Sequence, residues 1–239
     1  MIKKEQDPMG QAIYNFFHHQ DETPVRVTTN ITFEEELPVP YLFRTFNEMP
    51  LLERKAMDLV KGTVLDVGAG AGAHSVHLKE QDFEVTSIDV SELSCDVMKA
   101  RGLDTVSCSN IWTLTPQVYD TVLFMMNGIG LVKTLKGLEE FFEHLKKYVA
   151  VNGQVLLDSS DLRYLFEEED GAYWVDLNAD YYGELNYKLE YKDVVAQPFL
   201  WLFVDFNKLK LAAEKSNWQV ELIYQDDHFH FLVRLTFNS

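Results

Sequence analysis

Short apolar runs alternate with amphipathic stretches from residue 63 onward. The runs are typical of buried strands, and apolar residues at i, i+3 and i+4 spacing indicate helices between them. The predicted strands are TVLDV (63–67), FEVTSIDV (83–90), DTVSCS (104–109), DTVLFMM (120–126) and QVLLDSS (154–160). The predicted helices are GAHSVHLKEQ (72–81), SELSCDVMKARG (91–102) and a segment marked by Leu135, Leu138, Phe141, Phe142 and Leu145, which the turn Asn152-Gly153 is expected to end. Strands that alternate with helices predict right-handed βαβ units and a parallel sheet.

The pattern changes near residue 205. Residues 205–218 predict a helix, and WQVELIYQ (218–225) and FHFLVRLTF (229–237) predict two strands. Only residues 226–228 join these strands, so they form an antiparallel hairpin, because parallel neighbours need a long crossover. We therefore expect an α/β fold, a doubly wound and mostly parallel seven-stranded sheet that ends in an antiparallel hairpin.

Two regions lie outside this pattern, at residues 1–62 and 161–204. The first contains a predicted helix whose apolar residues share one face; they are Ile13, Phe16 and Phe17. The second contains an alternating stretch and then an apolar one, YYGELNYKLEYK (181–192) and QPFLWLFVD (197–205). This alternation predicts an inserted β-hairpin or strand pair. We therefore divide the chain into an N-terminal helical cap, residues 1–62, and a main domain, residues 63–239, with a β-rich insertion at 161–204.

The charge of the chain narrows the classes of partner. Its 38 acidic and 21 basic residues give a net charge of −17. A surface of this sign repels a phosphate backbone, so nucleic-acid partners are disfavoured. The apolar runs fall short of the roughly 20 residues that a membrane helix needs, so no membrane partner is expected. No oligomeric state follows from these patterns.

The two cysteines and the N-terminal residues indicate the cellular compartment of the protein. Cys95 and Cys108 have no metal-like spacing, and two reduced thiols are usual in a cytoplasmic protein. The first residues, MIKKEQDPMGQ, lack the apolar segment of a secretory signal. We expect a cytoplasmic protein without a metal site.

A glycine-rich loop, VLDVGAGAGAHS (64–75), includes the first predicted strand and opens a helix. Gly68, Gly70 and Gly72 let the backbone approach a ligand closely and direct helix N-terminal amides at an anion. Asp89 ends the next strand, where a carboxylate can accept hydrogen bonds from a ribose. With alanine at the third position, the loop also satisfies the looser dinucleotide pattern, so two cofactor classes fit.

The acid Asp66, two residues before the first glycine, helps to decide between these classes. A buried carboxylate beside a pyrophosphate would add like-charge repulsion. Beside a ligand with an ammonium and a sulfonium, the same carboxylate is favourable. S-adenosylmethionine has both cations, an adenosine, and one carboxylate for the helix amides. We therefore interpret the loop as a site for S-adenosylmethionine, with Asp66 as the countercharge.

Several segments resemble the motifs of class I S-adenosylmethionine-dependent methyltransferases. VLDVGAGAG resembles their first motif, and SIDVS, with Asp89, is similar to their second-strand acid. The segments similar to their adenine-contacting, fourth-strand and fifth-strand motifs are CSNIWTL (108–114), DTVLFMMNGIGL (120–131) and GQVLLDS (153–159). The resemblance covers about residues 60–160 and 205–237. The cofactor-binding residues that it implies are Asp66, Gly68, Ala69, Gly70, Gly72, Asp89, Val90, Asn110, Ile111, Met126 and Asn127.

The resemblance also implies a fold and an activity. The fold is the Rossmann-like methyltransferase sheet, with strand seven inserted between strands five and six. The activity is methyl transfer from S-adenosylmethionine to a small-molecule acceptor. Residues 126–129 read MNGI where nucleobase amine methyltransferases carry a proline-rich tetrapeptide, which disfavours nucleobases. The paired glutamates of arginine methyltransferases and the metal-binding acids of catechol-type enzymes are not apparent either.

Two alternatives remain open at this point. One is a nucleotide-dependent (NAD) oxidoreductase that uses the same glycine loop, and the other is a non-catalytic S-adenosylmethionine-binding protein. No catalytic residue is assigned, because a surface or packing role is common for every histidine considered: His18, His19, His74, His77, His228 and His230.

Three features outside the motifs have a functional and a structural interpretation. Arg44 could pair a cofactor carboxylate, although solvated arginines are commoner. The acid run at residues 167–170, with the tyrosines beyond it, could favour a cationic or aromatic acceptor, although such runs are usually solvated. The N-terminal cap could be a lid over the cofactor or a static packing element.

Overall fold

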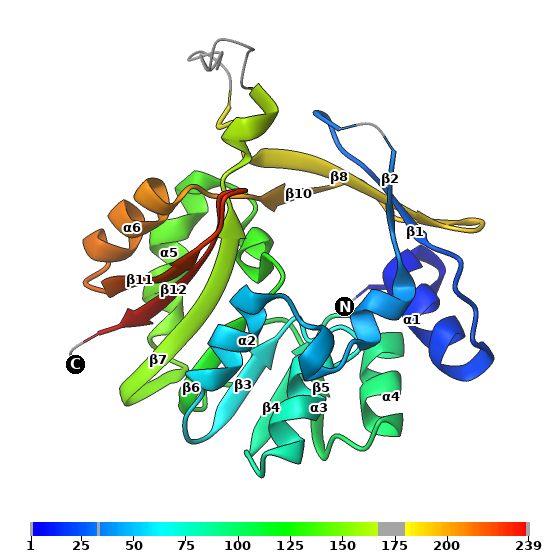
Figure 1. Cartoon of the computed structure of the whole chain (residues 1–239), viewed down its shortest axis with the longest axis horizontal. Helices are drawn as coiled ribbons and strands as arrows, with labels where there is room; N and C mark the ends of the chain where they lie inside the picture. The colour runs from blue at the N-terminus through cyan, green and yellow to red at the C-terminus, as the bar shows by residue number, and fades with distance from the viewer. Residues whose placement is uncertain (1, 33, 167–179, 238–239) are drawn as a thin grey trace.

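The computed structural model describes residues 2–32, 34–166 and 180–237 of the chain. Within them, the larger sheet has seven strands in the order β11-β12-β7-β6-β3-β4-β5 (Figure 1). These strands are β3 (Val64–Val67), β4 (Val85–Asp89), β5 (Thr105–Cys108), β6 (Tyr119–Phe124), β7 (Val149–Ser160), β11 (Gln219–Gln225) and β12 (His230–Thr236). Strands β3 to β7 pair in parallel, and β12 is antiparallel to both β7 and β11. The predicted α/β sheet with an antiparallel terminal hairpin is therefore confirmed, and β12 lies between β7 and β11.

Helices cover both faces of this sheet, because side chains of a strand point alternately to opposite faces. The helices are α1 (Pro8–His19), α2 (Leu51–Asp58), α3 (Ala73–Glu80), α4 (Glu92–Ala100), α5 (Leu138–Leu145) and α6 (Phe206–Lys215). Leu65 packs in the core shared with α5 and α6, whereas its neighbour Val64 packs in the core shared with α2 and α3. Ser91, the first residue of the predicted helix 91–102, accepts a hydrogen bond from the Ser94 amide and caps α4, which confirms the predicted start of that helix.

Short 3₁₀ helices connect several of these elements. They are η1 (Lys4–Gln6), η2 (Val39–Phe43), η3 (Phe46–Glu48), η4 (Gly128–Val132), η5 (Leu135–Gly137) and η6 (Leu162–Phe166). Every helix in the described ranges is too short or too polar to cross a membrane.

Strand β7 is longer than predicted. It begins at Val149, so the predicted turn at Asn152-Gly153 lies inside the strand instead of ending the preceding helix. Asn152 has a φ of +63°, and the pairing of β7 with β6 shifts in register near this point. The turn residues therefore produce an irregularity within a strand, which local composition alone does not distinguish from a connection.

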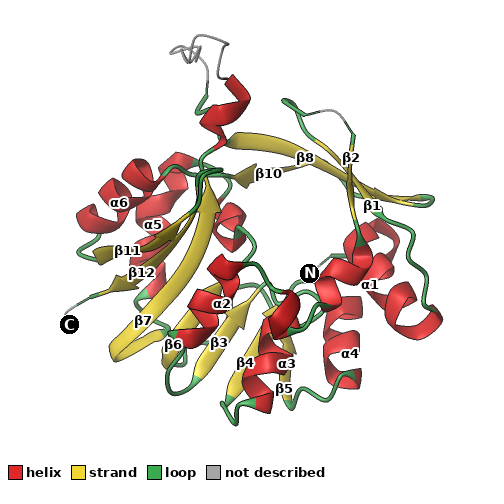
Figure 2. Ribbon diagram, viewed as in Figure 1, coloured by secondary structure: helices red, strands yellow, loops and turns green. Residues whose placement is uncertain are grey.

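A second, smaller sheet joins the N-terminal region to the insertion. Its strands are β1 (Val25–Thr28), β2 (Glu35–Leu37), β8 (Glu184–Tyr191), β9 (Val194–Val195) and β10 (Phe199–Leu202). Their order is β10-β8-β1-β2, with β9 also on β8, and every pair is antiparallel. Figure 2 shows this sheet arching beyond the carboxyl ends of the parallel strands. The predicted strand pair of the insertion is confirmed, whereas the predicted helical cap also contributes two strands to the same sheet.

Candidate active site

A cavity of about 630 Å³ lies between the two sheets. One end is lined by the glycine loop, by residues that follow β4 and β6, and by the start of α1. The other end is lined by residues of β1, β2, β8, β10 and η4. All of the residues that the sequence motifs imply, except Gly72, line this cavity. The fold therefore brings together segments that are separated by most of the chain.

The three glycines of the loop do different work. Gly68 and Gly70 have φ values of +72° and +58°, and a Cβ added at either would meet no atom within 4 Å. Since both line the cavity, a side chain at either position would occupy space that is open to a ligand. Gly72, with a φ of +81°, faces the other way, and its added Cβ would lie 3.0 Å from Leu103 and 3.1 Å from Met98. The first two glycines open the cavity, and the third permits close packing of α4.

Asp89, at the end of β4, supports the loop and faces the cavity. Its Oδ2 accepts a hydrogen bond from the Gly70 amide, and its Oδ1 accepts one from the Ser91 amide, each at 2.9 Å. Burial raises the pKa of this carboxyl, and the two amide hydrogen bonds act in the opposite direction. A carboxylate oxygen can accept more than one hydrogen bond, so each Asp89 oxygen keeps capacity for a ligand hydroxyl.

The N-terminal segment packs against the same end of the cavity. Asp7 accepts a hydrogen bond from the Gly10 amide and caps α1, while its second oxygen accepts one from the Ser91 hydroxyl at 2.5 Å. The Ile2 amide donates to the Val90 carbonyl at 3.2 Å. Asp7, Ile2 and Ser91 all line the cavity. The sequence motifs did not indicate them; the only local signal is the N-cap pattern of Asp7 followed by Pro8.

Asp66 lies beneath the glycine loop and is 2% exposed. Its Oδ2 accepts a hydrogen bond of 2.6 Å from the Ser75 hydroxyl, which in turn is 2.7 Å from that of Ser87. Burial holds the pKa of this carboxyl above its usual value, although the neighbouring His74 and the Ser75 hydrogen bond act in the opposite direction. A cation that binds beside Asp66 would favour its ionised form.

Arg44 is buried in an ion-paired cluster, so the expectation of a solvated side chain is wrong. Its Nε and Nη2 donate to Oε2 of Glu53 at 3.0 and 2.5 Å. His74 Nε2 lies 2.8 Å from the same oxygen. Burial raises the pKa of Glu53, but His74 and Arg44 more than offset this effect, so the pKa lies below its usual value. Arg44 and His74 also line the cavity, which places this cluster directly behind the glycine loop.

The turn after β6 is held in an unusual backbone conformation. Met126 and Asn127 have φ values of +59° and +57°, which non-glycine residues rarely adopt. The Asn127 amide donates to Asp158 at 3.0 Å, and the Asn127 side chain bonds the Leu202 carbonyl and the Ser159 hydroxyl at 3.1 and 2.8 Å. Asn127 therefore ties β6 and β7 to β10 of the smaller sheet.

We expect Asp158 to make the stability of the fold decrease with rising pH. Burial raises the pKa of this carboxyl from 3.8 to about 7, and its Oδ1 has no hydrogen-bond partner among the described residues. The folded state thus favours the protonated acid, and this contribution is complete below the unfolded pKa of about 4 and lost as the pH rises through about 7. Asp158→Asn, which keeps an acceptor for the Asn127 amide, should remove this dependence.

Urea unfolding of both proteins at about pH 5 and about pH 8 measures the effect. The stability of the variant should rise relative to that of the parent between the two pH values. A difference between the proteins that is the same at both pH values would contradict the shifted pKa of Asp158.

The segment after β5 contributes the predicted residues Asn110 and Ile111. Asn110 Oδ1 accepts a hydrogen bond from the Trp112 amide at 3.0 Å. The Ile111 carbonyl accepts one from the Tyr148 hydroxyl at 3.0 Å. Trp112 lines the cavity beside them. These bonds fix a turn at the cavity rim and leave the side chain of Ile111 in the apolar core.

The remaining candidates from the sequence lie away from the cavity or outside the described residues. Of the six histidines considered from the sequence, five do not line the cavity: His18, His19, His77, His228 and His230. His77 stacks on Phe46 with 4.3 Å between ring centroids, which is a packing role. The acid run at residues 167–170 lies outside the described residues. Among the described residues, no group of His, Cys, Asp or Glu is placed to hold a metal ion.

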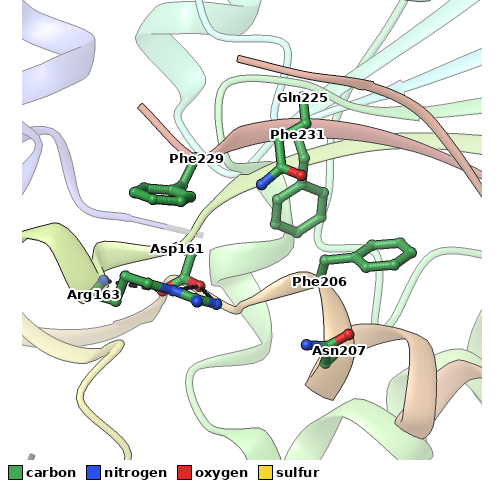
Figure 3. Close-up of a pocket in the computed structure, with 7 residues that line it drawn as sticks. All are labelled: Asp161, Arg163, Phe206, Asn207, Gln225, Phe229 and Phe231. Atoms are coloured by element: carbon green, nitrogen blue, oxygen red, sulfur yellow. Dashed lines mark hydrogen bonds and ion pairs between the residues drawn. The ribbon is translucent and has the colours of Figure 1, made fainter. Parts of the chain in front are cut away.

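A second cavity, of about 260 Å³, lies between η6, α6 and the terminal hairpin (Figure 3). Its charged groups are paired with each other, because Asp161 accepts hydrogen bonds from the Arg163 amide and from Nε at 3.0 and 2.5 Å. The Tyr182 hydroxyl donates to Asp161 at 2.7 Å as well. This pairing is sufficient to explain the cluster as a structural one.

Comparison with solved structures identifies close similarity to one methyltransferase. The structure of an S-adenosylmethionine-dependent methyltransferase from Bacteroides fragilis, in complex with S-adenosyl-L-homocysteine, is 42% identical to this chain. The match covers 100% of this chain and 98% of that one, with a TM-score of 0.93. No protein-family model and no curated protein gave a match.

More distant structures share the fold alone. DesVI from Streptomyces venezuelae is 16% identical over 79% of this chain and 91% of its own, with a TM-score of 0.57. CalS10, an amino pentose methyltransferase from Micromonospora echinaspora, is 13% identical over 80% and 93% of the two chains, with a TM-score of 0.55. Because the 42% identity extends over all of this chain and 98% of the other, the motif resemblance is confirmed. This chain belongs to the S-adenosylmethionine-dependent methyltransferases.

Proposed function

We propose that this methyltransferase transfers a methyl group to a small-molecule acceptor held between its two sheets. The observation that carries this proposal is the single cavity that joins the glycine loop to the apolar face of the smaller sheet. Its volume of about 630 Å³ suits small ligands. The net charge of −17 works against a nucleic-acid acceptor.

The residues around the glycine loop fit S-adenosylmethionine. The open space at Gly68 and Gly70 admits the methionine end, and the buried Asp66 provides a countercharge for its cations. Asp89 faces the cavity with capacity for two ribose hydroxyls. In this proposal the adenine lies along the residues after β4 and β5; they are Val90, Asn110 and Ile111. Ala69, Met126 and Asn127 complete the wall near the methyl group.

Bound S-adenosylmethionine supplies a methyl group that is already activated by a positively charged sulfur. The protein then contributes orientation and exclusion of water, because an in-line displacement depends strongly on the alignment of its reactants. The strained turn at Met126 and Asn127 is fixed by three hydrogen bonds, so it can form a rigid wall between cofactor and acceptor. We assign no catalytic base.

In this proposal the two predicted regions outside the main sheet act together. Residues 1–62 and 161–204 supply the strands of the smaller sheet and thus the acceptor end of the cavity. Residues 63–160 and 205–237 supply the sheet that carries the cofactor end.

Turnover tests the proposal. The protein is incubated with S-adenosylmethionine and a panel of small amines, alcohols and thiols, and release of S-adenosylhomocysteine is measured. We expect acceptor-dependent release with at least one class. Calorimetric titrations with S-adenosylhomocysteine and NAD run in parallel, and only the first should bind. Tighter binding of NAD would contradict the cofactor, and binding without turnover would favour the non-catalytic alternative.

Asp66→Asn should weaken the binding of S-adenosylmethionine by about tenfold. The reason is that hydrogen bonds and ion pairs with a charged group contribute most when the partner is also charged. Adenosine, which lacks the positive end, should lose little affinity. Calorimetry with both ligands measures the difference. Asp58→Asn, an exposed acid at the end of α2, is the matched control for loss of one charge. Equal losses for both ligands would mean that Asp66 only supports the loop.

Limited proteolysis should slow within residues 18–40 when S-adenosylhomocysteine is added. The segment contains exposed positions between α1 and β1, and the chain that precedes it is attached to the cofactor end through Asp7 and Ile2. Ligand that contacts this end should reduce opening of the segment. Mass spectrometry of the fragments locates the cleavage sites. Cleavage at an unchanged rate would favour static packing over a lid.

A further inference from the structure

The inward face of the smaller sheet forms the wall opposite the glycine loop. Antiparallel pairing places Phe199 opposite Tyr187, and Val27 opposite Leu189. Side chains two positions apart on a strand share a face, so Trp201 joins Phe199. All five residues line the cavity. An apolar wall of this kind is suited to the body of an organic ligand.

Aromatic rings dominate one half of this wall. The Tyr187 ring lies 5.9 Å from Phe199 and 6.2 Å from Phe203, and Phe199 lies 6.1 Å from Trp201. A Cβ added at Gly130 would lie 2.1 Å from Nε1 of Trp201, so the indole packs directly on the backbone of η4. The rings are thus held in place by each other and by the main sheet. Faces of aromatic rings attract cations.

The other half of the wall carries a carboxylate. Glu35 on the edge strand β2 lies opposite Val27 and so shares the inward face, whereas its neighbour Glu36 lies opposite Arg26 on the outward face. Glu35 is exposed and forms no ion pair with a described residue. Arg26, on the neighbouring strand, pairs with Glu34 and Glu190 instead. Burial raises the pKa of the Tyr187 hydroxyl, and the charge of the nearby Glu35 raises it further.

The charges of the cavity lining are unequal. The acidic residues of the lining are Asp7, Glu35, Glu36, Asp66 and Asp89, and the basic ones are Arg44 and Lys133. Arg44 is already paired with Glu53. Glu35 is therefore the unpaired inward carboxylate of the acceptor end, and the lining as a whole has more acidic than basic residues.

We propose that the acceptor is an organic cation with an apolar body, whose positive group binds between Glu35 and the aromatic rings around Tyr187. The apolar body lies on the inward face of the smaller sheet and reaches toward the turn after β6. This inference rests on the proposed function, because it takes the far end of the cavity as the acceptor end. It concerns recognition of the acceptor and leaves open which of its atoms receives the methyl group.

Three probes of equal size and different charge test the inference: phenethylamine, phenethyl alcohol and phenylacetate. Each is titrated at about pH 7 by calorimetry into protein saturated with S-adenosylhomocysteine. The ammonium should bind about tenfold more tightly than the alcohol, because hydrogen bonds to a charged group are the stronger ones. Phenylacetate should bind more weakly than either.

Glu35→Gln should reduce the preference for the ammonium to about twofold or less. Glu34→Gln is the matched control, because Glu34 is an exposed neighbour that pairs with Arg26 and does not line the cavity. It should keep the preference. The inference is overturned by tighter binding of the alcohol or phenylacetate, by no binding of the amine at millimolar concentration, or by a preference that survives in Glu35→Gln.

The first step of the experiment separates this inference from the proposed function. Failure of S-adenosylhomocysteine to bind would count against the proposed function itself. Normal binding of S-adenosylhomocysteine without a preference for the ammonium would overturn only the acceptor class.

Discussion

Glu53→Ala is expected to lower the free energy of unfolding by about 3–5 kcal/mol, since removal of one partner leaves an uncompensated buried charge. The Glu53 carboxylate binds both Arg44 and His74, and Arg44 is 4% exposed. Without Glu53, the guanidinium keeps its hydrogen bond to the Tyr41 carbonyl and its position 4.2 Å from the centroid of the Tyr41 ring, but no carboxylate partner among the described contacts. Urea unfolding followed by circular dichroism measures the loss.

Two further variants make the interpretation specific. Glu53→Gln keeps the shape and one acceptor, so it should be less destabilising than alanine. Glu214→Gln removes an exposed acid that faces Lys210 at 3.7 Å, and it should change stability by less than about 0.5 kcal/mol. A Glu53→Ala protein as stable as the Glu214 variant would show that the cluster contributes nothing to the fold.

The lowered pKa of Glu53 has a defined sign. Burial raises this pKa, but the interactions of Glu53 with His74 and Arg44 together outweigh burial. The pKa of Glu53 therefore lies below its usual value. Such a group adds stability that is present above its unfolded pKa of about 4.3 and lost as the pH falls through its folded pKa. The pH dependence that Glu53 adds to stability is thus confined to acid conditions, below the pH range in which Asp158 acts.

Asp89→Ala should weaken the binding of S-adenosylhomocysteine by about 10- to 100-fold, because hydrogen bonds to a charged group contribute roughly 1.5–3 kcal/mol each. From the sequence we would expect little change in stability, since the residue faces a cleft. The structure changes that expectation, because Asp89 also holds the amides of Gly70 and Ser91. We now expect a loss of about 1 kcal/mol or more in the free energy of unfolding as well.

The 2′-deoxy analogue of S-adenosylhomocysteine separates these two roles. It should bind the parent protein poorly and lose little more affinity in Asp89→Ala, if the ribose contact is what the variant removes. If both ligands lose the same factor, Asp89 acts by shaping the loop. Parent-like affinity of the variant for S-adenosylhomocysteine would remove Asp89 from the cofactor site.

The parts of the fold that were predicted correctly depend on neighbours in sequence. A buried strand such as Val64–Val67 is an uninterrupted apolar run apart from Asp66, and the loop after it requires glycines at positive φ. The terminal hairpin follows from a connection too short for any other geometry. Each of these features is determined within about ten residues.

The smaller sheet could not be predicted in the same way. Strand β1 is four residues long, and its partner β8 comes after all five parallel strands in the sequence. Arg26 therefore bonds Glu190, which is 164 residues away along the chain. Nothing near residue 26 indicates that partner. The burial of Arg44 and the contact of Asp7 with Ser91 depend on the same distant packing. The residues of the smaller sheet that line the cavity were missed for this reason, whereas most residues implied by the motifs do line it.

A crystal structure of the protein with S-adenosylhomocysteine would test the cofactor site most directly. The ribose hydroxyls should lie within hydrogen-bond distance of Asp89, about 3 Å, and the amino-acid end should lie over Gly68 and Gly70 beside Asp66. The sulfur should then face the turn at Met126 and the space below Trp201. A ligand bound outside this cavity, or one with its ribose away from Asp89, would contradict the assignment.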